Sequence, residues 1–369
     1  MPPPPFQIES GTCAAVFAFD IAQTIDLDEA ARLIREQTQR EHIRHQRRAP
    51  RYFEYKPPPL RLTQPIEAIA LTPRHRTTEA VDLIVYEFGA VAVLFSIDLT
   101  GGLEELAALS DHLYENETLL LEATHRVSAL LDAIRPATVN GQVAPMVEDY
   151  IIYHVRRFAG DPPPSAILAA WRSELAQVLR SERQTLSDQE VNDALDCQLA
   201  YSTSDLTVID WQAALVIDPA ADDVRAVLEF INVELLELRF LDDQLDQVLD
   251  RAYKTLTARS WRDWLLLHAR HREPRRLARL QIDSAVVFEE VNNALKLFGD
   301  QFLARVHRMA SQRLHIADWD AAIMRKLDTI DSIFQKLSDR QSTRRMEVLE
   351  WIIIILIAIS IVIAFLPGH

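Results

Sequence analysis

The feature that most constrains this chain is an uninterrupted apolar run close to its C-terminal end. Between Trp351 and Leu366 no residue is charged, and only Ser360 is polar. A helix of roughly 19 residues over 348–366 would be about 28 Å long, which matches the hydrocarbon thickness of a bilayer. A buried core strand, the alternative, needs only ~5 to 8 apolar residues. We therefore predict a membrane anchor with the residues Trp351, Ile352, Ile355, Ile359, Ile363 and Leu366.

The flanks of this run predict how it is oriented. Arg340, Arg344 and Arg345 precede it, and basic residues beside a span stay on the cytoplasmic side. The first residues have neither the basic nor the apolar region of a secretory signal. We expect a single-pass protein of the bacterial inner membrane whose body faces the cytoplasm, or alternatively one of the mitochondrial inner membrane that faces the matrix.

Composition narrows the choice of partners. The 369 residues are 49% hydrophobic, which is enough for one large or two ordinary domains. A formal charge of −15 argues against general attraction to nucleic acid or anionic lipid, so such a contact would need a local basic patch. The two cysteines, Cys13 and Cys197, form neither a disulfide framework nor a zinc ligand set.

The sequence pattern changes near residue 222. Residues 1–12 are predicted to be flexible, and 13–220 mix strand-like and helix-like segments, with a sub-boundary near 113–117. The predicted architecture is α+β, with an α/β-like N-terminal domain, a long antiparallel helical or coiled-coil bundle over 222–346, and one C-terminal transmembrane helix over 348–366.

The helical part follows a heptad pattern. Apolar residues recur at alternating spacings of four and three, as in Val224, Leu228, Ile231, Leu235 and Leu238. Pro274 predicts a turn into a second helix, and Asp318 is suited to begin a third. Two alternatives stay open: the second and third helices turn near Asp318, or they form one rod.

The strongest local charge patch surrounds the predicted turn at Pro274. Its arginines suit contact with lipid head groups or RNA phosphates. Alternatively, they balance the dipole of a helix that is acidic in its first half. The candidate patch for an anionic partner consists of Arg270, Arg272, Arg275, Arg276 and Arg279.

Two further clusters could hold a cation. His268 and His271 are three residues apart but lack a convincing third ligand. Asp242, Asp246 and Asp250 share one helix face and either bind a divalent cation or pair with basic helices. Pairing is the interpretation that we favour, and no metal site is predicted.

Catalytic motifs are absent from the sequence. The chain contains no phosphate-binding glycine loop and no GxSxG, HExxH or CxxC motif. Asp205, Asp210 and Trp211 fall within or beside a predicted strand over 206–218 and are either structural caps or an acidic site. We predict no catalytic residue and no cofactor.

Three segments carry a family resemblance. They are YEFGAVAV at 86–93, the stretch from LEF to LLELR at 228–239, and RRMEVLEWIII at 344–354. Through them the chain resembles the "required for meiotic nuclear division" family, a domain of unknown function found in bacteria, fungi and mitochondria. The resemblance implies a tail-anchored, non-catalytic protein. Mitochondrial members of that family are associated with tethering the translation machinery to the inner membrane.

The first functional hypothesis is a non-enzymatic, membrane-anchored scaffold or tether that acts through its α/β domain and helical bundle. The alternatives are a ribosome- or RNA-tethering module that uses the patch at 270–279, and a membrane-bound hydrolase or nucleotide-binding enzyme. Expected partners are the lipid bilayer, a protein, and RNA or the ribosome, with self-assembly through the bundle as a further expectation.

Overall fold

The computed structural model describes residues 4–41, 58–257 and 301–333. The chain divides into two compact units, Met1–Phe240 with Asp283–Trp319, and Leu241–Ile282 with Asp320–His369. The strands are β1 (Gln7–Asp20), β2 (Thr24–Ile25), β3 (Leu60–Pro65), β4 (Thr77–Val85), β5 (Ala90–Gly102), β6 (Thr138–Val139), β7 (Val147–Phe158), β8 (Gln198–Leu199), β9 (Leu206–Ile209) and β10 (Ala213–Ile217). The helices are α1 (Leu27–Glu41), α2 (Leu103–Leu113), α3 (Glu117–Ile134), the 3-10 turn η1 (Arg135–Ala137), α4 (Pro164–Ala170), α5 (Arg172–Leu179), α6 (Asp188–Asp196), α7 (Asp222–Thr257), α10 (Gln301–Arg313) and a helix over 316–333.

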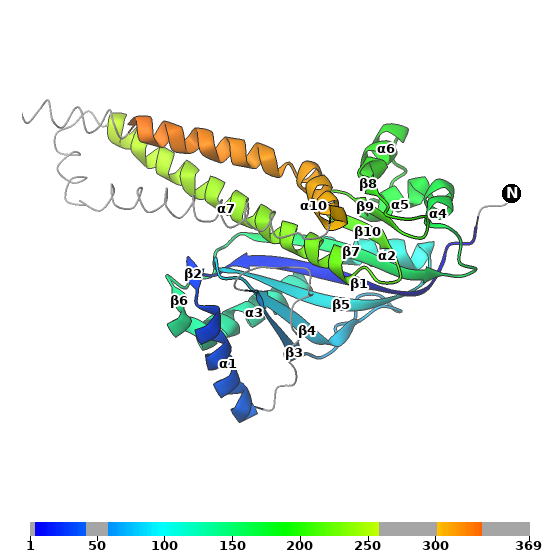
Figure 1. Ribbon diagram of the computed structural model, residues 1–369, viewed down its shortest axis with the longest axis horizontal. Coiled ribbons are helices and arrows are strands. Elements are labelled where there is room, and N and C mark those ends of the chain that lie inside the picture. The colour runs from blue at the N-terminus through cyan, green and yellow to red at the C-terminus, as the bar shows by residue number, and fades with distance from the viewer. Residues whose placement is uncertain (1–3, 42–57, 258–300, 334–369) are drawn as a thin grey trace, which may run out of the picture. The chain divides into compact units, whose positions relative to one another are not determined.

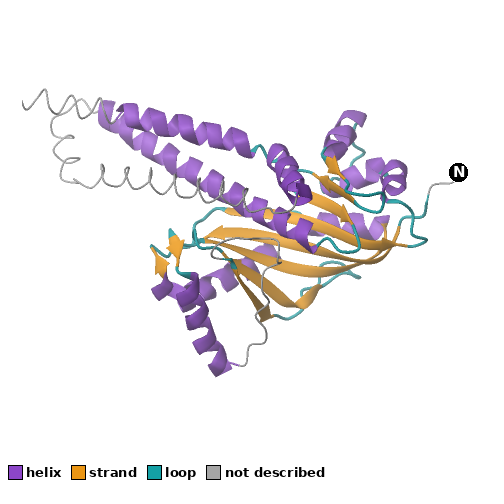
Figure 2. Cartoon of the chain, in the orientation of Figure 1, coloured by secondary structure: helices purple, strands orange, loops and turns teal. Residues whose placement is uncertain are grey.

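The first unit is a mixed α/β fold built on an eight-stranded sheet (Figures 1 and 2). The strand order is β3-β4-β5-β1-β7-β10-β9-β8, and every pair is antiparallel except the parallel pair of β7 and β10. Residues 13–19 of β1 are all apolar and buried, as expected for a strand that is covered on both faces. β1 therefore lies inside the sheet, between β5 and β7.

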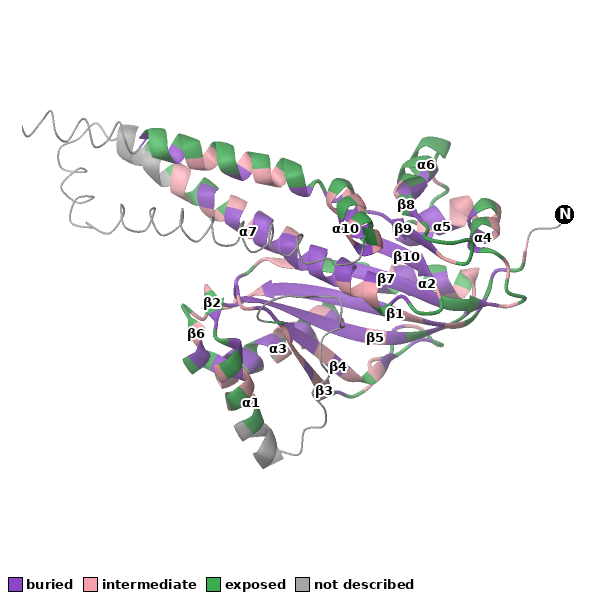
Figure 3. Ribbon diagram, viewed as in Figure 1, coloured by how far each residue is buried: buried purple, intermediate pink, exposed green. Residues whose placement is uncertain are grey.

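The two faces of the sheet differ in side-chain size. One face carries large residues such as Phe17, Phe95 and Tyr153 against α2, α3 and α5, and the Phe17 and Phe95 rings are 6.0 Å apart. On the opposite face, β1 and β5 carry small buried residues, including Ala18 and Ala92. Figure 3 shows the central strands buried along most of their length. The N-terminal half of α7 crosses this second face (Figure 1). α7 thus covers this second face of the sheet.

Two buried carboxylates of α7 are paired with basic side chains. Glu229 lies between Arg61 Nη2, at 2.9 Å, and Arg225 Nε, at 3.0 Å. Glu234 Oε2 is 3.0 Å from Nε2 of His307 on α10. Because a buried unpaired charge is strongly destabilising, these pairs determine how α7 and α10 pack.

The second unit contains the C-terminal part of α7 and most of the helix over 316–333. Lys326 Nζ lies 2.7 Å from Asp242 Oδ1 and 2.6 Å from Asp246 Oδ1. The predicted acidic face of α7 therefore pairs with a basic residue of a later helix. Of the two alternatives for these aspartates, a divalent-cation site or pairing with a basic helix, the structure agrees with pairing.

A break separates α10 from the following helix. α10 ends at Arg313, and His315 has a φ of 53°. The Asp318 amide donates to the His315 carbonyl at 3.0 Å, and the helix over 316–333 follows. Of the two alternatives, the turn is therefore correct, and it comes three residues earlier than Asp318.

The predicted membrane architecture is corrected. Across 4–41, 58–257 and 301–333, no helix is both long enough and apolar enough to cross a bilayer. The longest helix there, α7, is amphipathic and acidic, and charged residues at the bilayer centre are costly. The predicted fold with one C-terminal transmembrane helix, the tail-anchored class and the single-pass membrane location are thus not supported. Residues 348–366 and the arginine patch at 270–279 lie outside the described residues.

We predict that Ala92→Leu destabilises the first unit by about 1 to 3 kcal/mol, because the fully buried face beneath α7 has no room for three more carbons. Urea unfolding measures the change. The matched control is Ala108→Leu on the exposed side of α2, which should stay within about 0.5 kcal/mol of the parent. Equal stabilities of the two variants would contradict close packing on this face.

Candidate functional site

The tip of the β9–β10 hairpin forms one wall of the candidate site. Asp210 follows β9, its amide donates to the Ala213 carbonyl at 2.9 Å, and Trp211 and Gln212 occupy the tip. The buried hydroxyl of Tyr150 on β7 donates to the Asp210 carbonyl at 2.9 Å. Trp211 remains 48% exposed.

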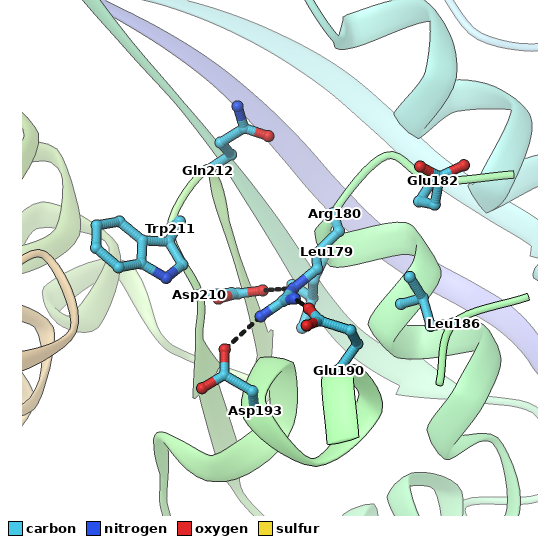
Figure 4. A pocket seen from close by; sticks show the side chains of 9 residues that line it. All are labelled: Leu179, Arg180, Glu182, Leu186, Glu190, Asp193, Asp210, Trp211 and Gln212. Carbon is cyan, nitrogen blue, oxygen red and sulfur yellow. Dashed lines mark hydrogen bonds and ion pairs between the residues drawn. The ribbon is translucent and has the colours of Figure 1, made fainter. Parts of the chain in front are cut away.

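An open cavity of about 550 Å³ lies beside this tip (Figure 4). The end of α5, the loop after it, α6 and the hairpin supply its walls. Two leucines give it an apolar part, and the other lining residues are polar, charged or aromatic. The lining residues are Leu179, Arg180, Glu182, Leu186, Glu190, Asp193, Asp210, Trp211 and Gln212.

An ion-pair network organises the cavity around Asp210, whose side chain is 1% exposed. Arg180 Nε bonds Asp210 Oδ2 at 3.0 Å, and Arg180 also pairs with Asp193 and Glu190 (Figure 4). Arg313, from the end of α10, bonds Asp210 Oδ1 through Nε at 3.0 Å and Asp193 Oδ2 through Nη2 at 2.8 Å. Two guanidinium groups therefore neutralise the buried carboxylate.

Acidic groups nevertheless outnumber basic ones here. Four carboxylates against two guanidinium groups leave a formal charge of −2 around the cavity. The hydrogen bond from Arg313, followed by that from Arg180, lowers the pKa of Asp193 from 3.8 to about 2. The site thus presents negative charge to solvent throughout the neutral range.

Trp211 also contacts the turn after α10. The ring of His315 stacks on it, with centroids 5.0 Å apart and planes 25° apart. Arg313 Cζ lies 5.7 Å from the Trp211 ring centroid, which is the distance of a cation–π contact. One guanidinium group is thereby placed against both the aromatic ring and the carboxylates.

The other residues predicted from the sequence have structural roles or lie elsewhere. Asp205 accepts hydrogen bonds from the amides of Tyr201 and Ser202 at 2.7 and 2.6 Å, so it is a turn cap, as one interpretation proposed. In 4–41, 58–257 and 301–333, no cluster of three His, Cys, Asp or Glu side chains could hold a metal ion. His268 and His271 lie outside those ranges, as do Arg270, Arg272, Arg275, Arg276 and Arg279.

The chemistry available at the site favours binding. Burial raises the pKa of the partly buried Cys197 thiol to about 11, so the thiol stays protonated at neutral pH. Both carboxylate oxygens of Asp210 are engaged by arginines, so neither is positioned to act on a substrate as a general base. Sequence reasoning identified Asp210 and Trp211 but missed Arg180 and Arg313, which meet them only through the tertiary fold.

Asp210→Asn is expected to lower the free energy of unfolding by about 3 kcal/mol, because it leaves two guanidinium groups without their buried counter-charge. Urea unfolding at pH 7 measures the loss. Asp132→Asn, at an exposed pair with Arg135, is the matched control and should change it by less than about 0.5 kcal/mol. A loss no larger than that of the control would show that the network contributes little to stability.

The lowered pKa of Asp193 predicts a pH dependence. A carboxylate whose pKa is lower in the folded than in the unfolded protein stabilises the folded state at pH values above the unfolded pKa. That stabilisation is lost as the pH falls from about 4 to about 2. Asp193→Asn should therefore be less stable than the parent at pH 6, and the difference should vanish near pH 2. Chemical denaturation at several pH values measures it. A pH-independent difference would contradict ionic pairing of Asp193.

Comparison with known proteins places this site within a family domain. No solved structure matches the chain. The uncharacterized protein MJ0711 of Methanocaldococcus jannaschii is 22% identical over 220 residues, which cover 59% of this chain and 66% of that protein, slightly less than two thirds. Neither finding bears on the predicted meiotic nuclear division resemblance. The family model described as "Uncharacterized protein MJ0711, N-terminal domain" matches residues 10–223, more than half of the chain, which therefore belongs to this family.

Proposed function

We propose that the protein is a non-enzymatic scaffold whose α/β unit binds a basic segment of a partner protein in the cavity beside Trp211. The observation that carries this proposal is the combination, in one open cavity, of a half-exposed tryptophan and a surplus of carboxylates. Exposed aromatic anchors next to polar rims are typical of sites that bind protein segments.

The side chains around the cavity match the chemistry of arginine or lysine. Glu190 is 49% exposed and pairs with Arg180 through one oxygen, so its other oxygen can accept a hydrogen bond from an incoming cation. Asp193 is 53% exposed, accepts from both arginines and adds its negative charge to the cavity. Leu179 and Leu186 offer apolar surface to the aliphatic stem of such a residue. The ring of Trp211 adds a cation–π contact.

The binding free energy of each basic residue is small, because the side chains that would bind it are exposed to solvent. A single exposed ion pair contributes about 0 to 1 kcal/mol, and a cation–π contact about 0.5 to 2 kcal/mol. Three basic residues, one of them on Trp211, therefore contribute at most about 5 kcal/mol, which corresponds to a Kd on the order of 0.1 to 1 mM. We therefore expect the partner to present several arginines or lysines in one segment.

The alternative functions gain less support at this site. A phosphate-bearing ligand such as RNA would meet a net negative cavity whose arginines are already paired with carboxylates. A hydrolase would need a positioned base, whereas Asp210 is held by two guanidinium groups. Binding of a basic segment, by contrast, needs only the excess carboxylates and the exposed Trp211.

We expect the purified 369-residue chain to bind a blocked peptide with three arginines separated by glycines, and to bind the same peptide with citrulline in place of arginine much more weakly. Citrulline keeps the shape and removes the charge. Trp211→Ala should weaken arginine-peptide binding about tenfold, because the cation–π contact is lost. Isothermal titration calorimetry measures both effects.

Tyr114→Ala supplies the matched control for this experiment. Tyr114 is an exposed aromatic residue that follows α2 and does not line the cavity, so its replacement should leave the affinity unchanged. Equal binding of the arginine and citrulline peptides, or equal affinity of the parent and Trp211→Ala, would refute the proposed function.

A further inference from the structure

We infer that Arg313 is an internal ligand of the Trp211 cavity, and that the basic segment of a partner competes with it for the same side chains. The inference rests on the proposed function, and it adds a regulatory contact between α10 and the site. It concerns only residues of the first unit, to which both Arg313 and the cavity belong.

The contacts of Arg313 are those expected of a bound basic residue. Its guanidinium nitrogens bond Asp210 and Asp193, and its Cζ lies 5.7 Å from the centroid of Trp211. Two carboxylates and one aromatic face are the groups that a partner's arginine would use. The site is therefore partly satisfied from within the chain.

Arg313 also differs from Arg180 in its position relative to the family domain. Arg180, Asp193, Asp210 and Trp211 all lie within residues 10–223, the part of the chain that matches the family model, whereas Arg313 lies beyond that match. Arg180 ends α5 in the wall of the cavity and contacts three of its carboxylates. Arg180 is thus part of the site itself, and Arg313 is the cation that can be exchanged.

The local backbone favours movement at the end of α10 and not of the whole helix. Leu303, Val306 and Ala310 are buried and hold the helix in place. Beyond them, α10 ends at Arg313, and His315 adopts a left-handed conformation that costs a non-glycine residue about 1 kcal/mol. Leu314 and Ile316, on either side of His315, are also buried, so exchange of Arg313 disturbs the packing of the turn over 314–318 but leaves Leu303 to Ala310 in place.

His315 completes the internal ligand. Its exposed imidazole stacks on Trp211 and so covers ring surface that an incoming cation would use. The same ring is 2.8 Å from Asp318 Oδ2, which positions it. Two side chains of one turn, Arg313 and His315, thus occupy the aromatic part of the site together.

The first test compares peptide affinity in three chains: the parent, Arg313→Gln and His315→Ala. If Arg313 occupies the site about 90% of the time, its removal should increase the affinity for the arginine peptide about tenfold. His315→Ala should produce a smaller increase, since it frees only the ring. Because His315 is exposed, this variant keeps the test valid even if Arg313→Gln is poorly folded.

The second test uses the parent chain alone and follows amide hydrogen exchange with and without the arginine peptide. Binding should speed exchange at the amides of Leu314, His315 and Asp318, whose hydrogen bonds form the turn. Amides of Leu303 to His307 should keep their exchange rates, because that part of α10 stays packed.

The outcomes separate this inference from the proposed function. Increased affinity in both variants together with faster exchange in the turn would support competition. Binding of the arginine peptide with unchanged affinity in the variants and unchanged exchange would overturn the inference and leave the proposed function intact. Failure of all three chains to distinguish arginine from citrulline peptides would overturn both.

Discussion

The structure around the site depends on the need to neutralise one buried carboxylate, that of Asp210. Arg180 lies 30 residues before it in the sequence and Arg313 lies 103 residues after it, and both guanidinium groups meet on its two oxygens. Removing a carboxylate from water costs several kcal/mol unless such partners are present. This requirement therefore joins the end of α5 to the hairpin tip, and Arg313 at the end of α10 supplies the second counter-charge.

The sheet places Asp210 where this requirement can be met. β1 and the middle of β7 are buried on both faces, and α7 covers the second face. α7 in turn carries the buried Glu234, which pairs with His307 of α10 at 3.0 Å. Packing of α7 on the sheet thus positions α10, and α10 brings Arg313 to the cavity.

Local patterns in the sequence predicted elements better than they predicted contacts. The heptad pattern that includes Val224 and Leu238 predicted a long helix, which is α7, and the predicted acidic face of that helix pairs with Lys326. The predicted strand over 206–218 is in fact two strands, because the turn at Trp211 and Gln212 contains no glycine, proline or asparagine to reveal it. Arg180 and Arg313 could not be assigned to the site from the sequence, because only the tertiary fold brings distant ion-pair partners together.

The division of roles among the acidic residues distinguishes a binding site from a purely structural network. Asp210 is buried and fully engaged, so its charge holds the fold together. Glu190 and Asp193 are about half exposed, and their charges exceed what the two arginines neutralise. A network that served stability alone would not need this excess, because exposed carboxylates add little to it. The excess is most useful when a further cation arrives, and Trp211 lies where that cation would be bound.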